Sequence, residues 1–306
     1  MATTAVVIPT FNRCSTLLFA LSKLFETLPL THRVIVIDSG SSDGTLDAVR
    51  KHFPQVVSIE GNSSLWWAAA TNAGIKKAKE LGCKYLLTYN DDNVATPELL
   101  GNLVMAAEGA PKSILAAVCC YLQKPDIVFF AGRMRAKGTD RFYYLDHDVP
   151  LSALGKGLRL VDMLHGMCTL FPMAVFDTVG LFNEQAFPQV FADDDLLLRA
   201  SRAGFSLQVA LEAIVLNDRT KTGVNPYDRR LGPSGILELL VSRRSTFQLA
   251  ARTRFLWRYR RSFFLFCKTW LCDYLRLFTV LTARWMLPLK AFHWIGIHWG
   301  QRLHRR

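Results

Sequence analysis

The chain has 306 residues, half of them apolar, so it can bury a substantial core in one large domain plus an appendage. Its seven cysteines form no zinc-type C-x-x-C pair and lie mostly in apolar segments, which excludes a disulfide framework and predicts reduced thiols of a cytosolic protein. The net charge of +12 comes from the carboxyl-terminal part, because residues 241–306 hold 14 Lys or Arg and one acid, whereas residues 1–240 are nearly neutral.

Short apolar runs alternate with helix-like runs up to about residue 240, the pattern of a mostly parallel sheet wrapped by helices. The predicted strands cover residues 6–8, 34–37, 56–59, 83–88, 114–121 and 127–130. The predicted helices cover residues 14–28, 45–52 and 66–81, and residues 133–157 are predicted to form a looping insertion. The amino terminus has neither a basic segment nor a cleavage signal, so we do not expect export.

The second predicted strand ends in an acid and leads into a Gly/Ser turn, Asp38-Ser39-Gly40-Ser41-Ser42-Asp43-Gly44-Thr45. A carboxylate at a strand end can accept hydrogen bonds from a nucleotide base or a ribose, and small turn residues let the backbone approach a ligand. An ordinary turn with an Asp cap would give the same pattern. The G-x-G-x-x-G and G-x-x-x-x-G-K-[ST] motifs are absent, which argues against a nicotinamide dehydrogenase and a P-loop NTPase.

An acidic run, Tyr89-Asn90-Asp91-Asp92-Asn93, follows the apolar strand at residues 83–88. Open α/β sheets bind ligands at the carboxyl edge of their strands. Carboxylate and amide oxygens are the ligands that Mg²⁺ or Mn²⁺ selects, usually together with phosphate oxygens. A helix cap before Thr96 would explain one of these polar residues but not four. The run therefore predicts a metal-diphosphate site.

These blocks together resemble the family-2 glycosyltransferases, an inverting group with a nucleotide-sugar-binding α/β fold. Four blocks carry the match in the right order: residues 7–13 (VIPTFNR), 36–45 (VIDSGSSDGT), 90–92 (NDD) and 192–199 (ADDDLLLR). Residues 61–67 and 71–74 also resemble a segment of rhamnosyltransferase-like members. The resemblance covers residues 6–218 and implies a GT-A-type, Rossmann-like mixed sheet with helices on both faces. The charge pattern after residue 240 adds a basic amphipathic helical tail to this fold.

The resemblance also implies a nucleotide-sugar site, in which Thr10 and Asp38 hold the nucleoside. The triplet at residues 90–92 matches the Asp-x-Asp motif, which implies Mn²⁺ or Mg²⁺ on the diphosphate with Asp92 as the chief ligand. The predicted donor-binding residues are Pro9, Thr10, Asn12, Arg13, Asp38, Ser39, Asn62, Trp67, Asn72, Asn90 and Asp91. The other predicted metal ligands are Asn90 and, where members often carry a His, Asn217 or Asp218.

The cluster Asp193-Asp194-Asp195 matches the family's Glu-Asp-x-Asp-x-x-x-Arg pattern when it is aligned on Arg199. Inverting transfer needs one carboxylate to take the proton of the acceptor hydroxyl. The alignment implies Asp193 as this base, Asp194 as the second choice and Asp195 as a structural acid. A helix start that is enriched in acids to suit the helix dipole would explain one or two of the three.

The segment at residues 164–172 resembles the strand and loop that face the acceptor in the family. This implies His165, Gly166 and Met167 on the acceptor side. A histidine in such a segment is more often packed or in a turn than catalytic.

Residues 241–306 form a basic tail that holds five of the seven tryptophans. Taken as one helix, residues 258–284 place most of their charges within an arc of roughly 160°, opposite Phe, Leu, Trp and Val. Since no stretch of 18 residues is free of charge, the pattern favours a helix lying on an anionic membrane surface over a spanning helix. Alternatively, the apolar face packs on residues 1–240. Nucleic acid binding is not expected, because no such motif is present.

Together with the resemblance, these features predict a metal-dependent, inverting glycosyltransferase at the cytoplasmic face of the plasma membrane. A place in bacterial O-antigen or capsule synthesis is implied by the resemblance alone. The donor would be a UDP-, dTDP- or GDP-linked hexose or a deoxyhexose such as rhamnose, and the acceptor would be lipid-linked or a growing polysaccharide. One alternative is a catalytically impaired membrane-bound scaffold, suggested by Asn90, Ala192 and the missing His. The other is a sugar nucleotidyltransferase, which needs a Gly-rich amino-terminal loop that residues 9–13 do not supply.

Overall fold

The computed structural model describes residues 3–27, 32–138, 140–218 and 231–288. The chain divides into two compact units. The first comprises Met1–Met134 and Tyr144–Thr222, and the second comprises Arg135–Tyr143 and Gly223–Arg306. The boundary predicted at residues 240/241 falls inside the second unit, at the end of helix α7 (Pro233–Val241).

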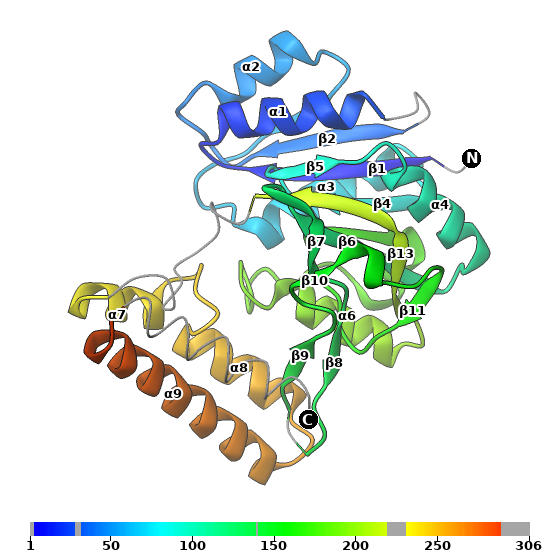
Figure 1. The fold of residues 1–306 in the computed structure, drawn as a ribbon. Helices are drawn as coiled ribbons and strands as arrows, with labels where there is room; N and C mark the ends of the chain where they lie inside the picture. The colour runs from blue at the N-terminus through cyan, green and yellow to red at the C-terminus, as the bar shows by residue number, and fades with distance from the viewer. Residues whose placement is uncertain (1–2, 28–31, 139, 219–230, 289–306) are drawn as a thin grey trace. The chain divides into compact units, whose positions relative to one another are not determined.

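The first unit is built on one mixed β-sheet. Its strands are β1 (Thr4–Thr10), β2 (Arg33–Asp38), β3 (Val57–Glu60), β4 (Tyr85–Tyr89), β5 (Asn93–Ala95), β6 (Ser113–Tyr121), β7 (Lys124–Phe130), β10 (Val149–Pro150), β11 (Leu158–Leu160), β12 (Cys168–Pro172) and β13 (Ser206–Asn217). The order is β10-β7-β6-β12-β4-β1-β2-β3, and β13 pairs with β6, β5 and β11 (Figure 1). Strands β1 to β4 pair in parallel, whereas β12 lies antiparallel between β4 and β6.

Helices cover both faces of this sheet. They are α1 (Cys14–Phe25), α2 (Thr45–His52), α3 (Trp67–Glu80), α4 (Leu99–Gly109), α5 (Met173–Val179) and α6 (Ala192–Arg202). Side chains alternate along β1, so Val6 and Ile8 share a core with Leu17 of α1. The residue between them, Val7, faces α3, where a Cβ added at Gly74 would lie 2.4 Å from its Cγ1. The glycine lets α3 approach the sheet closely. With a central sheet and helices on both of its faces, the predicted α/β fold is confirmed.

The segment predicted as a loop at residues 133–157 contains several short elements. They are the hairpin strands β8 (Arg133–Arg135) and β9 (Phe142–Tyr144), the strand β10 and the 3-10 helix η1 (Leu151–Ala153). β10 pairs with β7 and so extends the sheet. Strands of two or three residues carry too little alternation of apolar and polar residues to be recognised in a sequence.

The second unit contains α7, α8 (Leu249–Tyr259) and α9 (Phe263–Met286). The prediction of a single helix over residues 258–284 is therefore wrong. The chain leaves the helix at Arg260, which is extended with ψ 138°. Ser262 then caps the next helix, because its hydroxyl accepts a hydrogen bond of 3.2 Å from the backbone N–H of Leu265.

A small apolar core holds the helices of the second unit together: Leu231, Leu239, Leu277 and Leu281. Two residues of the predicted charged arc face inward. Asp273 forms ion pairs with Arg141 and Arg252, and the side chain of Arg284 is buried, with 6% of the residue exposed. Within the described part of the chain, no helix is long and apolar enough to cross a membrane. Residues 289–306 of the predicted tail, with Trp294 and Trp299, lie outside the described residues.

Candidate active site

Most of the predicted donor-site residues lie at the carboxyl ends of three parallel strands or directly after them. β1 ends at Thr10, β2 ends at Asp38, and these two residues are register partners. β4 ends at Tyr89, directly before the acidic run. Because the strands are parallel neighbours, their ends lie at one edge of the sheet.

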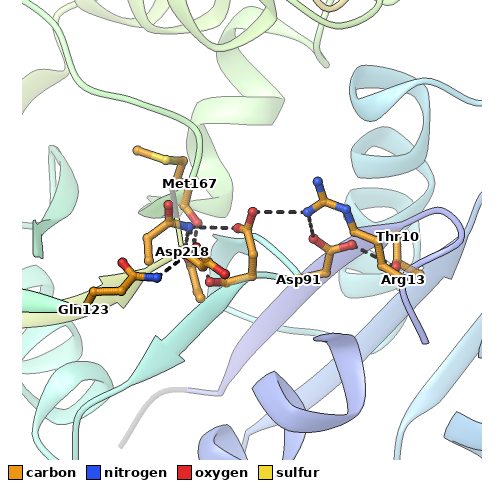
Figure 2. A network of polar contacts seen from close by, with 9 residues as sticks. Thr10, Arg13, Asp91, Gln123, Met167 and Asp218 are labelled. Carbon is orange, nitrogen blue, oxygen red and sulfur yellow. Dashed lines mark hydrogen bonds and ion pairs between the residues drawn. The ribbon is translucent and has the colours of Figure 1, made fainter. Parts of the chain in front are cut away.

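Thr10, Arg13 and the two acids of the run form one network (Figure 2). The Thr10 hydroxyl donates to Asp91 Oδ2 at 2.9 Å, and Arg13 Nη1 donates to Asp91 Oδ1 at 2.9 Å and to Asp92 Oδ2 at 3.1 Å. Both acids are buried, with 6% and 7% exposed. Burial, reinforced by the charge of Asp92, raises the pKa of Asp91 although Arg13 opposes this. Burial by itself would lower the pKa of Arg13, but the two carboxylates raise it overall.

The second oxygen of Asp92 is bound from β13. Asn217 Nδ2 donates to Asp92 Oδ1 and to Asn93 Oδ1, each at 2.8 Å. Asp218 lies beside them, with its Oδ1 accepting from Gln123 Nε2 at 3.1 Å. Asn217 thus presents a nitrogen to Asp92, and its own Oδ1 is buried and accepts no hydrogen bond from the described residues.

This arrangement does not fit a divalent metal. Every carboxylate oxygen of Asp91 and Asp92 accepts a hydrogen bond from a protein donor, and Arg13 bridges the two acids, so a metal ion between them would have to displace the guanidinium. In the ranges that the structure describes, no group of three or more His, Cys, Asp or Glu could hold a metal ion. Asn90, another of the predicted metal ligands, donates its backbone N–H to Met167 O at 3.0 Å.

The turn after β2 and the loop after β1 are bonded to each other. The backbone N–H of Asn12 donates to Ser41 Oγ, and Asn12 Oδ1 accepts from the backbone N–H of Ser42, both at 2.8 Å. Asp38 is 2% exposed and accepts from the backbone N–H of Ser41 at 3.0 Å. Asn12 has a φ of +50°, a conformation that Asn tolerates better than most residues. The two loops form a rigid rim at the predicted nucleoside position, beside Pro9 and Ser39.

Three other predicted donor residues have structural partners. Asn62 Oδ1 accepts from the backbone N–H of Ser64 at 3.0 Å. Asn72 is buried: its Nδ2 donates to Phe182 O at 2.9 Å, and its Oδ1 accepts from the backbone N–H of Phe182 at 3.0 Å. The backbone N–H of Trp67 donates to Gln189 Oε1 at 3.1 Å. Of these three, Trp67 has its ring next to Gly166, the residue whose N–H binds Asp193.

Asp193 lies at the first turn of α6 and is held by two backbone donors. Its Oδ2 accepts from the N–H of Gly166 at 2.8 Å, and its Oδ1 accepts from the N–H of Asp194 at 3.0 Å. Asp194 forms an ion pair with Arg133. Burial raises the pKa of Asp193 to about 6; the charge of Asp194 adds to this and that of Arg133 opposes it.

Asp195 and His165 have structural surroundings. Asp195 is fully buried and accepts from Arg199 Nε at 2.9 Å, while the same guanidinium donates to Leu181 O at 2.9 Å. His165 Nδ1 accepts from the backbone N–H of Met167 at 2.9 Å, and its Nε2 lies 3.2 Å from Cys119 Sγ. Burial, with the charge of Arg133, lowers the pKa of His165 to about 3, so the ring is neutral and packed.

The loop His165–Met167 joins the two acidic clusters. Met167 O accepts from the backbone N–H of Asn90 at 3.0 Å and from Asn93 Nδ2 at 2.8 Å, and the adjacent Gly166 binds Asp193. A Cβ added at Gly166 would lie 2.8 Å from the Trp67 ring and 3.2 Å from Asp193 Cβ. The loop therefore fixes the predicted base next to the predicted donor site.

The sequence interpretation missed Arg133, because its partner Asp194 is 61 residues away. It also missed that Arg13 pairs with both Asp91 and Asp92, at separations of 78 and 79 residues. No local pattern marks such pairs. A chemical hint was present for Arg13 alone, since an acidic run at a buried strand end requires a compensating cation.

A family model described as "Glycosyl transferase family 2" matches residues 5–175, which is more than half of the chain. Among solved structures, GalNAc-T7, crystallised with UDP, GalNAc and Mn²⁺, superposes with a TM-score of 0.58 at 14% identity, covering 71% of this chain and 44% of that one. Residues 1–349 of S. aureus TarS in complex with UDP superpose with a TM-score of 0.52 at 17% identity, covering 70% and 59%.

A second TarS structure gives a TM-score of 0.53 at 17% identity over 79% of this chain and 40% of that one. At these identities the likeness shows the fold alone. The chain spans about half the length of the solved proteins that it matches. No curated protein matches the chain significantly.

Proposed function

This chain belongs to glycosyl transferase family 2, and from that premise we propose that it transfers a sugar from a nucleotide-diphosphate donor to an acceptor hydroxyl with inversion at the anomeric carbon. The observation that carries the proposal is the loop His165–Met167, which holds Asp193 beside the acids at the end of β4. A donor site and a proton acceptor are thus within one rigid arrangement, as a single displacement requires.

The donor side of the proposal uses the rim formed by the loops after β1 and β2. Asp38 and Thr10 are at adjacent strand ends, where a base and ribose would be held. We propose a UDP-sugar as the first donor class to test, because GalNAc-T7 and TarS were crystallised with UDP. The dTDP- and GDP-sugars remain predicted alternatives, as does a deoxyhexose such as rhamnose, which rests on residues 61–67 and 71–74.

The acceptor side of the proposal uses Asp193 as general base. The acceptor oxygen bonds to the anomeric carbon, the bond from that carbon to the diphosphate oxygen breaks on the opposite face, and the hydroxyl proton passes to Asp193. Two backbone N–H donors orient the carboxylate, and its raised pKa makes it a stronger proton acceptor than an ordinary Asp. Asp194 is less suited to this role, because Arg133 already binds it.

Mn²⁺ or Mg²⁺ at Asp92 stays a prediction from the motif. GalNAc-T7 was crystallised with Mn²⁺, which supports the prediction by analogy of fold. The bonds of Arg13 and Asn217 to the same carboxylates oppose it. No step of the proposed transfer is assigned to a metal.

We also propose that the second unit lies on an anionic membrane surface. The outer face of α9 carries exposed, large apolar side chains within an arc of about 100°: Phe264, Leu271, Leu275, Phe278, Trp285 and Met286. Exposed basic residues border this face, among them Lys268 and Arg276. A helix with this composition binds in the plane of a membrane interface, through apolar insertion and attraction to anionic lipids.

A lipid-linked acceptor follows from the membrane proposal. The second unit has a cavity of about 640 Å³ lined mainly by apolar side chains of α7 and α8, including Leu240, Leu249 and Trp257, with Arg254 among the lining residues. This composition suits a lipid chain and its phosphate. The cytoplasmic face of the plasma membrane is proposed on this basis, whereas bacterial O-antigen or capsule synthesis is proposed from the family resemblance alone.

A donor panel tests the function. The full chain is incubated with UDP-, dTDP- and GDP-sugars and a lipid-linked acceptor extract, and labelled product and free nucleoside diphosphate are measured. We expect product from one donor class. Release of pyrophosphate from a nucleoside triphosphate and a sugar phosphate would instead identify a nucleotidyltransferase, and donor binding without turnover would identify a scaffold.

A further inference from the structure

The charge of the donor site presents a problem that the proposed function must solve. Asp91 and Asp92 are adjacent carboxylates at the edge where a diphosphate would bind, and both are buried. Unless a cation lies between them, these acids repel each other and the diphosphate. The acids are therefore compatible with an anionic ligand only if a positive charge is fixed there.

Arg13 supplies this charge from within the chain. Its Nη1 bonds one oxygen of each acid, at 2.9 Å and 3.1 Å, and so bridges them. About a third of the Arg13 side chain (32%) is exposed, whereas 9% and 5% of the two acid side chains are. Arg13 is therefore the most accessible of the three side chains, and planar guanidinium groups bind phosphate well.

The surroundings of Arg13 favour an anion as well. Arg13 immediately precedes α1, and the amino end of a helix of this length attracts negative charge. A cavity of about 180 Å³ adjoins this end, lined by Ser15 and Thr16 of α1 and by two acids, Asp92 and Asp218, so an anion at this position requires the positive charge of Arg13. On the far side of Asp92, the amide of Asn217 satisfies the remaining carboxylate oxygen without adding charge.

We propose that Arg13 takes the place of the divalent cation in this donor site, so that a nucleoside diphosphate binds without added metal. The inference rests on the proposed function, because it assumes a nucleotide-sugar donor. The guanidinium cancels one of the two carboxylate charges and faces the diphosphate. As the nucleoside diphosphate departs, the same group stabilises the negative charge that develops on it.

Binding of UDP, dTDP and GDP to the full chain, measured by calorimetry in EDTA and again in Mn²⁺ or Mg²⁺, tests the inference. For the wild type we expect affinities that agree within about twofold between the two conditions. R13M should lose about tenfold or more in EDTA, because a charge-assisted contact to phosphate is removed. Mn²⁺ should restore part of this loss, since both acids are then open to a metal.

Two further variants make the result decisive. R13K keeps the charge but loses the planar bridge, so its nucleotide affinity in EDTA should lie between those of the wild type and R13M. If R13M folds poorly, the comparison of R13K with the wild type still tests the bridge. R33M is the matched control, because Arg33 is exposed at the amino end of β2, the edge opposite the site. Wild-type binding that EDTA weakens more than about tenfold, or R13M binding equal to wild type in EDTA, would overturn the inference. If the wild type binds no nucleotide under either condition, the proposed function itself fails, and the inference with it.

Discussion

Asp193 has surroundings unlike those of Asp91 and Asp92. The two acids of the run bond a cation, whereas Asp193 bonds two backbone N–H groups and stands next to another acid. Burial and the charge of Asp194 together raise its pKa to about 6, although Arg133 opposes this. Carboxylates whose environments differ in this way suit different roles. Asp91 and Asp92 balance the charge of Arg13, and in the proposed function Asp193 accepts the proton.

Replacing the base should separate transfer from binding. We expect D193N to lower the transfer rate by about 10² to 10⁴, the usual contribution of a general base, with unchanged affinity for the donor. Its melting temperature should change little, because the removal of a buried charge stabilises the fold, whereas the amide nitrogen of Asn cannot accept the hydrogen bond from one of the two backbone N–H groups. D195N is the contrasting variant: it breaks a buried ion pair with Arg199 and should unfold at a markedly lower temperature. Equal transfer by D193N and wild type would contradict the role of Asp193.

The transfer rate should depend on pH through the same group. Below about pH 6 Asp193 is protonated and cannot take the acceptor proton, so the rate should rise with pH through this region and then level off. Residual transfer by D193N should lack this acid limb. A rate that increases as the pH falls would show that a different group, acting as an acid, controls the reaction.

At this scale the sequence predicted the acids, and the resemblance put Asn217 in the same site as a metal ligand, but the ion pairs of Arg13 and Arg133 were missed. Thr10, Asp38, Asp92 and Asp193 were recognisable because each stands in a short block after a strand or at a helix start. That Asn217 donates to Asp92 could not be predicted, because the bond depends on how β13 folds back across 125 residues.

At the scale of elements, the loop between β11 and β12 connects the two acidic clusters of the site. Gly166 is in contact with the Trp67 ring at the start of α3 and with Asp193 at the start of α6. A side chain at this position must displace one of the two. The geometry of the site therefore depends on Gly166. A glycine is needed there because a side chain would not fit, and not because of its backbone conformation, since its φ is not positive.

G166A should impair transfer more than donor binding. The added Cβ would come within 2.8 Å of the Trp67 ring, so the loop must shift and the base must move; we expect a loss of about tenfold or more in rate. Adding W67L should restore part of the rate by making room. G101A is the matched control, because a Cβ at this position in α4 meets nothing within 4 Å. If G166A and G101A behave alike, the loop does not position the base.

Elements with strong local patterns were predictable, and those without were not. The helix Thr45–His52 has its predicted bounds, because an acid-capped turn precedes it and its apolar residues repeat at helical spacing. The break between α8 and α9 was missed, because Arg260 and Arg261 fit a helix and the capping role of Ser262 appears only in the backbone geometry. The hairpin β8–β9 was missed because each strand has three residues.

At the scale of the whole molecule, charge and apolar surface are distributed unevenly. The basic excess after residue 240 belongs to the same unit as the exposed face of α9. The sequence shows this asymmetry directly. The alternation of strand-like and helix-like runs, not the composition, predicted the α/β fold, because alternating strands and helices have few ways to pack. The inward position of Asp273 and Arg284 was beyond composition, since it depends on how three helices pack.

Removing the apolar face should release the protein from membranes. We expect the full-length double variant F264S/F278S to bind anionic vesicles at least about tenfold more weakly than wild type, since each buried Phe contributes about 1.5–3 kcal/mol. UDP binding should not change. M105S, which replaces an exposed methionine on α4, is the matched control. Equal sedimentation of F264S/F278S and wild type with vesicles would refute the membrane role of α9.

The most direct test of the central claim is the stereochemistry of the product. The full chain is given the donor that the panel identifies and a lipid-linked acceptor, and the anomeric configuration of the new bond is determined by NMR. A single displacement assisted by Asp193 predicts a configuration opposite to that of the donor, from one sugar transferred per nucleoside diphosphate released. Retention of the donor's configuration, or no transfer from any nucleotide sugar, would contradict the account.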